Sequence, residues 1–162
     1  MKTLIIIRHA KAEISCTLND FERSLNDRGK MDAPVMAKRL RKKIKIDAFV
    51  CSPAKRTKKT AEFFADAYGL NQKEIIYVSA LYQATSSVFF DIVSSLDNSL
   101  NSVAIVAHNP GITSFANELT TEANLDNMPT CSVFAVQADV DNWSAFGKAK
   151  KQFLFFDYPK NM

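Results

Sequence analysis

Residues 2–9 read Lys2-Thr3-Leu4-Ile5-Ile6-Ile7-Arg8-His9, a short apolar run that ends abruptly at a guanidinium and an imidazole. The run has the length and the β-branched composition of a buried strand. Open α/β sheets bind their ligands at the carboxyl edge, where such a strand ends. The sequence therefore predicts that Arg8 and His9 stand side by side at a ligand-binding edge.

The second of the two histidines repeats this arrangement. The apolar residues 103–107 precede His108, and Asn109-Pro110-Gly111 follows it. Parallel strands place their carboxyl ends at the same edge of a sheet. We therefore expect His9 and His108 to lie close together.

Helical periodicity alternates with short apolar runs along the chain. Strands are predicted at 2–7, 46–51, 75–78, 103–107, 131–136 and 153–156. Helices are predicted up to Ile44, from Ser52-Pro53 to Gly69, around 88–96 and from Pro110-Gly111, and a polar loop over 12–26. This alternation is typical of an α/β fold, so we expect a three-layer αβα sandwich with a mostly parallel central sheet. Without a linker or an internal repeat, residues 1–162 are expected to form a single domain.

Composition and charge argue against several classes of protein. The hydrophobic fraction of 47% is that of a globular protein, and no apolar stretch approaches the roughly 20 residues of a membrane helix. The chain carries a net charge of +4. Its densest basic run, residues 38–45, keeps the apolar spacing of an amphipathic helix and lacks the aromatic side chains that stack on bases. We therefore expect neither nucleic acid nor a membrane as a partner.

Cys16, Cys51 and Cys131 are odd in number and lack the spacing of metal ligands. All three are interpreted as small apolar filler in a reduced cytoplasm. The first residues lead directly into a strand, without the longer apolar region and the cleavage site of a signal peptide. The expectation is a cytoplasmic monomer.

A helix is predicted to begin at Ser52-Pro53, with a capping hydroxyl and a proline suited to the first helical position. Its first two turns carry Lys55, Arg56, Lys58 and Lys59. Cations at this positive end of the helix dipole are unfavourable by about 0.3–1 kcal/mol each, and a bound anion reverses the sign. We interpret the lysines as facing solvent and Arg56 as an anion ligand.

Several segments, taken together, resemble one known family. They are Arg8-His9-Ala10-Lys11 within residues 4–11, and residues 21–29, 51–61, 106–111 and 128–132. In this order they resemble the arginine–histidine signature, the loop into the first helix, the second-arginine motif, the second-histidine motif and the late segment of the histidine phosphatase superfamily, which has the phosphoglycerate mutase-like fold. More narrowly, the chain is similar to the SixA-type phosphohistidine phosphatases over nearly its whole length.

The resemblance implies a role for each site residue. His9 would be the nucleophile, forming a phosphohistidine intermediate that water hydrolyses. Arg8, Arg56 and His108 would surround the phosphoryl oxygens, and Arg23 would add a further phosphate contact. Neither a metal nor another cofactor is expected, and the sequence offers no clustered His/Asp/Glu set to hold a metal.

Two departures from the family pattern bear on the chemistry. Ala10 stands where many members have glycine, so strain is expected if that backbone needs a positive φ. Many members also carry an acidic residue after the third strand that protonates the leaving oxygen, whereas residues 79–85 contain no carboxylate. Such an acid raises the reaction rate by roughly 10²–10⁴-fold. Asp20 and Glu22 are alternative proton donors.

The missing carboxylate favours a substrate that needs no enzyme acid. The distal nitrogen of a phosphorylated imidazole takes its proton from solvent, so we expect a phosphohistidine phosphatase, acting on a protein such as a phosphorelay domain. The alternatives are a general small-molecule phosphomonoesterase and a non-catalytic domain that binds phosphate or phosphoproteins. Retention of both histidines and both motif arginines favours an enzyme over a binder.

Overall fold

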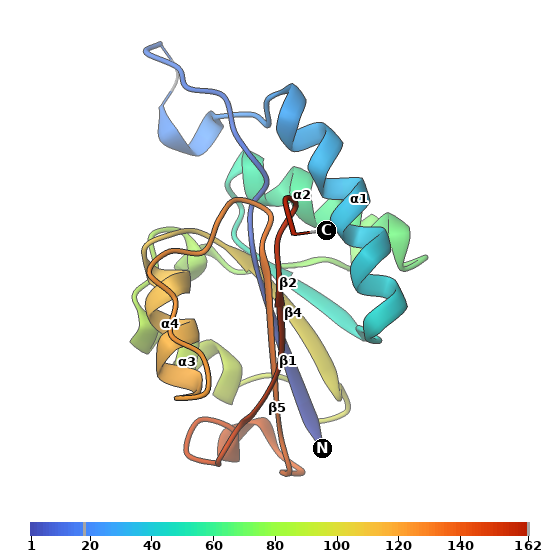
Figure 1. The fold of residues 1–162 in the computed structure, drawn as a ribbon, viewed down its shortest axis with the longest axis vertical. Helices are drawn as coiled ribbons and strands as arrows, with labels where there is room; N and C mark the ends of the chain where they lie inside the picture. The colour runs from blue at the N-terminus through green and yellow to red at the C-terminus, as the bar shows by residue number, and fades with distance from the viewer. Residues whose placement is uncertain (18, 162) are drawn as a thin grey trace.

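The computed structural model describes residues 1–17 and 19–161, and its six strands form one sheet in the order β3-β2-β4-β1-β5-β6 (Figure 1). The strands are β1 (Lys2–Arg8), β2 (Ala48–Cys51), β3 (Ile76–Tyr77), β4 (Ser102–Ala107), β5 (Val133–Ala138) and β6 (Gln152–Asp157). The first four are mutually parallel, whereas β5 pairs antiparallel with β1 and with β6. The predicted α/β sheet is confirmed, with an antiparallel edge.

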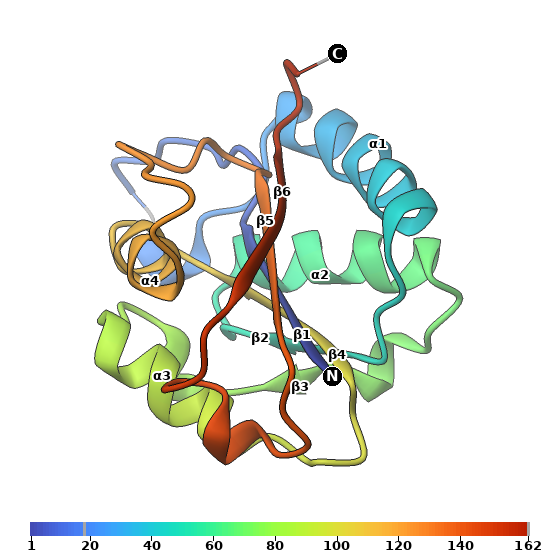
Figure 2. The same ribbon diagram turned by 60° about the horizontal axis from the view of Figure 1, so that its bottom comes forward.

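Helices cover both faces of this sheet (Figures 1 and 2). The α-helices are α1 (Asp27–Lys43), α2 (Lys55–Ala67), α3 (Ser86–Ser94) and α4 (Gly111–Leu119), and short 3-10 turns are η1 (Asp20–Glu22), η2 (Gln72–Glu74), η3 (Ser79–Leu81) and η4 (Trp143–Ala145). The helices α1 and α2 lie on one face, and α3 and α4 lie on the other. The three-layer αβα architecture is confirmed.

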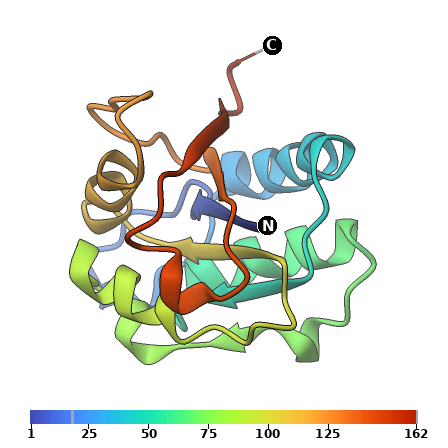
Figure 3. The ribbon, with the colours of Figure 1, turned by 90° about the horizontal axis from the view of Figure 1, so that it is seen from below.

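The strand β1 lies in the middle of the molecule (Figure 3). Ile5 and Ile7 pack in the hydrophobic cluster under α1 and α2, and Leu4 and Ile6 pack in the cluster under α3 and α4. A strand buried on both faces reads as a continuous apolar run rather than as an alternating one. This burial explains the composition of residues 4–7.

The register of the parallel strands fixes which residues meet at the carboxyl edge. Arg8 on β1 is opposite Ala107 on β4, and Cys51 on β2 is opposite Val106 on β4. The next residues along these three strands are therefore neighbours: His9, His108 and Ser52. The register of the sheet is enough to bring these three residues together, without any contribution from the loops.

Several boundaries and one burial prediction differ from the sequence-based expectation. The strand expected from residue 131 begins at Val133, because Cys131 adopts a φ of 60° and donates its N–H to the carbonyls of Arg8 and His9. The strands expected at 46–51 and 75–78 shorten to β2 and β3. Cys16 is exposed, so its interpretation as apolar filler is wrong, whereas Cys51 and Cys131 are buried. Within the loop expected over 12–26, Leu18 lies outside the described residues.

The helix expected from Ser52-Pro53 begins at Lys55, and the capping role of Ser52 is wrong. The N-cap residue is Ala54, and no side chain caps the helix. The Ser52 hydroxyl instead bonds to His108. Among the described residues, no helix is long and apolar enough to cross a membrane.

Candidate active site

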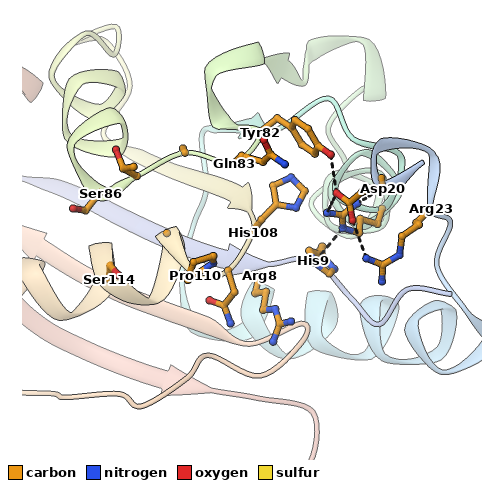
Figure 4. Close-up of a pocket in the computed structure, with 15 residues that line it drawn as sticks. Arg8, His9, Asp20, Arg23, Tyr82, Gln83, Ser86, His108, Pro110 and Ser114 are labelled. Carbon is orange, nitrogen blue, oxygen red and sulfur yellow. Dashed lines mark hydrogen bonds and ion pairs between the residues drawn. The ribbon is translucent and has the colours of Figure 1, made fainter. Parts of the chain in front are cut away.

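An open cavity of about 630 Å³ lies at the carboxyl edge of the parallel strands (Figure 4). All five residues singled out from the sequence line it: Arg8, His9, Arg23, Arg56 and His108. The rings of His9 and His108 stand with their centroids 5.5 Å apart. The structure thus brings together side chains that lie up to a hundred residues apart in the chain.

His9 follows β1 directly and is 7% exposed. Its Nδ1 lies 2.7 Å from the carbonyl oxygen of Ala10. Because a carbonyl only accepts hydrogen bonds, this contact holds the proton on Nδ1 and leaves Nε2 unprotonated, with a lone pair that can accept. The Nε of Arg56 donates to that Nε2 over 3.3 Å. The imidazole is therefore fixed in one tautomer, with its basic nitrogen facing a guanidinium.

The pKa of His9 is lowered from 6.5 to about 3. Burial is the main cause, and the neighbouring His108, Arg56 and Arg8 lower the pKa further, against the opposing effect of the Ala10 carbonyl. His9 is consequently neutral at physiological pH. A neutral imidazole can act as a nucleophile without first losing a proton.

Arg56 enters the cavity from the first turn of α2 and is 5% exposed. Its Nη1 donates to the backbone carbonyl of Asp20 at 2.7 Å, and its Nη2 donates to the Asp20 carboxylate at 2.9 Å. The lysines of the same turns, Lys55, Lys58 and Lys59, are exposed. The expectation that the lysines face solvent is confirmed. Arg56 lines the cavity, and its role as an anion ligand stays a prediction.

Arg8 extends from the last position of β1. Its Nη1 donates to the Met128 carbonyl at 2.8 Å, so its partner is a backbone oxygen and not a carboxylate. Its Nε has no partner. Among the residues that the structure describes, only three buried side-chain atoms lack one: Arg8 Nε, His108 Nδ1 and Ser132 Oγ. Arg8 and His108 line the cavity, so two of these three unmet hydrogen-bonding groups belong to cavity residues.

Asp20 supplies the carboxylate that lines this cavity. It accepts hydrogen bonds from Arg56, from Tyr82 Oη at 2.7 Å and from Arg23 Nη1 at 2.9 Å. Partial burial alone would raise the pKa of Asp20, but the hydrogen bonds from Tyr82, Arg56 and Arg23 together lower it well below its usual range. Asp20 is therefore ionised, and it is bound to two of the arginines that the sequence analysis assigned to phosphate.

Tyr82 is a cavity residue that the sequence analysis did not single out. It belongs to residues 79–85, the segment that contains no carboxylate. Its ring meets the ring of His108 edge to face at 5.5 Å, and it meets Phe21 in the same manner at 5.1 Å. The hydrogen bond to Asp20 raises the pKa of Tyr82. Its position in the loop after a predicted strand, at the same edge as His9, was the available signal.

His108 follows β4, and its Nε2 lies 2.7 Å from the hydroxyl oxygen of Ser52. The pKa of His108 is lowered from 6.5 to about 4, mainly by burial and then by Arg56, with Asp20 opposing. His108 is therefore also a neutral ring near pH 7. As such it has a single N–H to donate and carries no full positive charge.

The backbone beside the two histidines is not strained at Ala10. Among the described non-glycine residues, only Gln83 and Cys131 have a positive φ, so alanine is accommodated at position 10. The N–H of Ala10 donates to Thr60 Oγ1 on α2 at 3.0 Å. Within the described part of the chain, no group of three or more His, Cys, Asp or Glu side chains is arranged to hold a metal ion.

Comparison with known families gives one match. The model of the histidine phosphatase superfamily (branch 1) matches residues 4–82, which span β1, the loop with Asp20 and Arg23, the second-arginine segment and Tyr82. A search of curated proteins gives no match.

Solved structures resemble this one over almost its full length. A candidate phosphohistidine phosphatase SixA from Nakamurella multipartitia superimposes with a TM-score of 0.81 at 22% identity, covering 98% of this chain and 96% of the other. A candidate SixA from Agrobacterium tumefaciens gives 0.80 at 21%, covering 98% and 99%. The protein histidine phosphatase SixA in complex with tungstate gives 0.83 at 22%, covering 98% of each chain. These likenesses establish the fold.

Proposed function

We propose that this chain is a metal-independent phosphatase of the histidine phosphatase superfamily, whose family model matches residues 4–82, and that it removes phosphate from phosphohistidine on a protein. His9 is the nucleophile, and Arg8, Arg56 and His108 bind the phosphoryl oxygens. Arg23 is a further phosphate contact. One observation carries the proposal: the unprotonated Nε2 of His9 lies in a cavity lined by three arginines and a second neutral histidine.

The reaction takes two displacements at phosphorus. In the first, the Nε2 lone pair of His9 attacks phosphorus and the phosphorus–nitrogen bond of the substrate breaks. The leaving imidazole takes its proton from solvent. In the second, water attacks the phosphorylated His9, which releases phosphate and restores the free ring. The arginines accelerate both steps to the extent that their hydrogen bonds tighten as charge shifts to the oxygens.

The side chains that line the cavity favour a leaving group that needs no proton from the enzyme. A phosphomonoester of an alkyl alcohol needs a proton donor, and the carboxyl group in the cavity, Asp20, is ionised and already accepts three donors. The Tyr82 hydroxyl donates to Asp20, and its pKa is raised. Phosphohistidine needs no such acid, so it fits this lining better than an alkyl phosphate does.

The fold relatives support the ligand class. One of them is solved with tungstate, a tetrahedral oxyanion, which makes inorganic phosphate and tungstate the first ligands to test on this chain. Two relatives described as phosphohistidine phosphatases and one described as a protein histidine phosphatase support a protein-borne phosphohistidine as the substrate.

Kinetics with two substrates test the proposal. We expect wild-type protein to hydrolyse a phosphohistidine protein faster than an alkyl phosphate. His9→Asn replaces the imidazole with an amide that is not nucleophilic, so it is expected to abolish turnover of both. Faster cleavage of the alkyl phosphate would favour the small-molecule phosphomonoesterase. Tight phosphate binding with no turnover of either substrate would favour a binding domain.

A further inference from the structure

Ser52 contacts His108 at the carboxyl edge of the parallel strands, and it has no role in the reaction proposed above. Ser52 is fully buried, directly after β2, and its Oγ lies 2.7 Å from His108 Nε2. The contact can run in two directions, because a hydroxyl both donates and accepts and a neutral imidazole carries its proton on either nitrogen. The direction decides which nitrogen of His108 offers a hydrogen bond to a ligand.

Counting unmet groups separates the two directions. If His108 Nε2–H donated to Ser52, the Ser52 hydroxyl proton would lack an acceptor and His108 Nδ1 would be a bare acceptor without a donor, which leaves two buried groups unmet. Within the described part of the chain, the only other hydrogen bond of Ser52 Oγ is one that it accepts, from the Ala54 N–H at 3.5 Å. If Ser52 donates to Nε2 instead, its hydroxyl is satisfied and only His108 Nδ1–H is left unmet. Unmet buried polar groups are costly, so the second direction is favoured.

We propose that Ser52 is a positioning residue that donates to His108 Nε2, holds the proton on Nδ1 and thereby makes His108 a neutral hydrogen-bond donor to the phosphoryl group. The unmet Nδ1–H of His108 and the unmet Nε–H of Arg8 then belong to two residues that line one cavity. The consequence for catalysis rests on the proposed function, whereas the tautomer itself does not.

Burial keeps the His108 ring neutral, so its tautomer decides which nitrogen donates a hydrogen bond. The pKa of His108 lies at about 4, so the ring is neutral at physiological pH and carries only one proton. A protonated ring would donate from both nitrogens whatever Ser52 did. His9 has the same tautomer for a different reason, because the Ala10 carbonyl holds its Nδ1 proton. One ring is thus bare at Nε2 for attack, and the other is protonated at Nδ1 for binding.

The ¹⁵N chemical shifts of the histidine rings test the proposal directly. The chain has two histidines, so the spectrum contains two ring systems, and protonated and bare nitrogens differ strongly in shift. We expect the wild-type protein to show both rings protonated on Nδ1. In Ser52→Ala, the His108 signals are expected to shift toward the Nε2–H form while those of His9 stay unchanged. Ser52→Thr, which keeps a hydroxyl, is expected to restore the wild-type pattern.

A matched control removes a different buried hydroxyl. Ser102 lies at the opposite end of β4, is 8% exposed and donates to the Lys45 carbonyl. Ser102→Ala is expected to leave both rings and the affinity for inorganic phosphate unchanged. Ser52→Ala is expected to weaken phosphate binding roughly tenfold, the effect of one lost hydrogen bond to an anion.

Two results would overturn the inference. One is a wild-type His108 ring protonated on Nε2, which decides the matter even if Ser52→Ala fails to fold. The other is a folded Ser52→Ala protein whose His108 tautomer and phosphate affinity equal those of the wild type. A protein with the predicted tautomer but no phosphatase activity would instead contradict the proposed function alone.

Discussion

At the scale of single residues, the cavity combines strong positive charge with two neutral imidazoles. Burial beside the guanidinium groups of Arg8 and Arg56 lowers the pKa of both histidines, so neither adds a proton near pH 7. Asp20 offsets part of the charge by accepting from Arg56 and Arg23. Asp20 therefore competes with an incoming phosphoryl group for the guanidinium groups of Arg56 and Arg23.

Titration of the two rings tests this charge balance. The pKa values of His9 at about 3 and of His108 at about 4 predict that neither ring takes up a proton between neutral pH and about pH 5. A pH series of histidine NMR spectra measures this for both rings at once. An ordinary titration centred near pH 6.5 for either ring would contradict the burial argument.

The Asp20→Asn variant tests whether Asp20 donates a proton to the leaving group or competes with phosphate for the arginines. Since Asp20 is ionised, we expect the variant to keep kcat on a phosphoramidate within about tenfold, whereas loss of a general acid would cost roughly 10²–10⁴-fold. We also expect inorganic phosphate to inhibit the variant more strongly, because Arg56 and Arg23 lose an internal partner. Steady-state kinetics with phosphate as inhibitor gives both quantities.

Glu22→Gln is the matched control for Asp20. Glu22 is an exposed carboxylate on the same 3-10 turn and does not line the cavity, so its removal is expected to change neither quantity. Weaker phosphate inhibition in Asp20→Asn would mean that Asp20 chiefly holds the arginines in place.

At the scale of elements, the sequence predicted those parts of the site that depend on local pattern. The apolar runs before His9 and His108 became β1 and β4, and the basic start of α2 placed Arg56 in the cavity. Ser52 fits a helix cap by local pattern, but the neighbouring strand places His108 within hydrogen-bond distance of its hydroxyl. That contact depends on strand order, which propensity does not encode.

The loop contributions were the least predictable part. Asp20 and Tyr82 lie 62 residues apart and meet through one hydrogen bond, with Arg56 as a third participant. The late start of β5 has a similar origin, because Cys131 turns to bond the carbonyls of Arg8 and His9 on another strand. Such contacts join segments that lie far apart in the chain, so no short window of sequence predicts them.

The approach of α1 to the loop after His9 gives a prediction at this scale. A Cβ on Gly29, in the first turn of α1, would collide with the backbone carbonyl of Lys11, and backbone yields little. Gly29→Ala is expected to lower the free energy of unfolding by about 1–3 kcal/mol. Urea denaturation measures the loss.

Gly147→Ala is the corresponding control. A Cβ at Gly147 would meet only the Phe90 side chain at an ordinary 3.4 Å. Its effect on the free energy of unfolding is expected to stay within about 0.5 kcal/mol. Equal losses in the two variants would contradict the close-contact argument.

At the scale of the whole molecule, strand order assembles the site. The parallel strands β2, β4 and β1 are adjacent, so their carboxyl ends deliver Ser52, His108 and His9 as a row. The helices α1 and α2 close one face and α3 and α4 the other, which buries the strands on both sides. The histidines therefore sit at the rim of a dense core, and that burial keeps them neutral.

The stability of the whole chain should depend on pH through these histidines. Their folded pKa values lie below the ordinary 6.5, so the unfolded chain binds more protons between that pH and about 4. Stability is expected to be greatest above pH 6.5 and to fall as the pH drops through this window. Urea denaturation near neutral pH and near pH 5 measures the slope, which should flatten in a His9→Gln, His108→Gln variant. An unchanged slope in that variant would assign the acid sensitivity to other groups.

The most direct test of the account is rapid-quench trapping of the phosphorylated protein. Wild-type protein mixed with a phosphoramidate and quenched in base within its first turnover should carry acid-labile phosphate on Nε2 of His9, located by mass spectrometry and ³¹P NMR. His9→Asn should carry none. Turnover without any phosphorylated protein, or phosphate found on His108 instead, would contradict the assignment of His9 as the nucleophile.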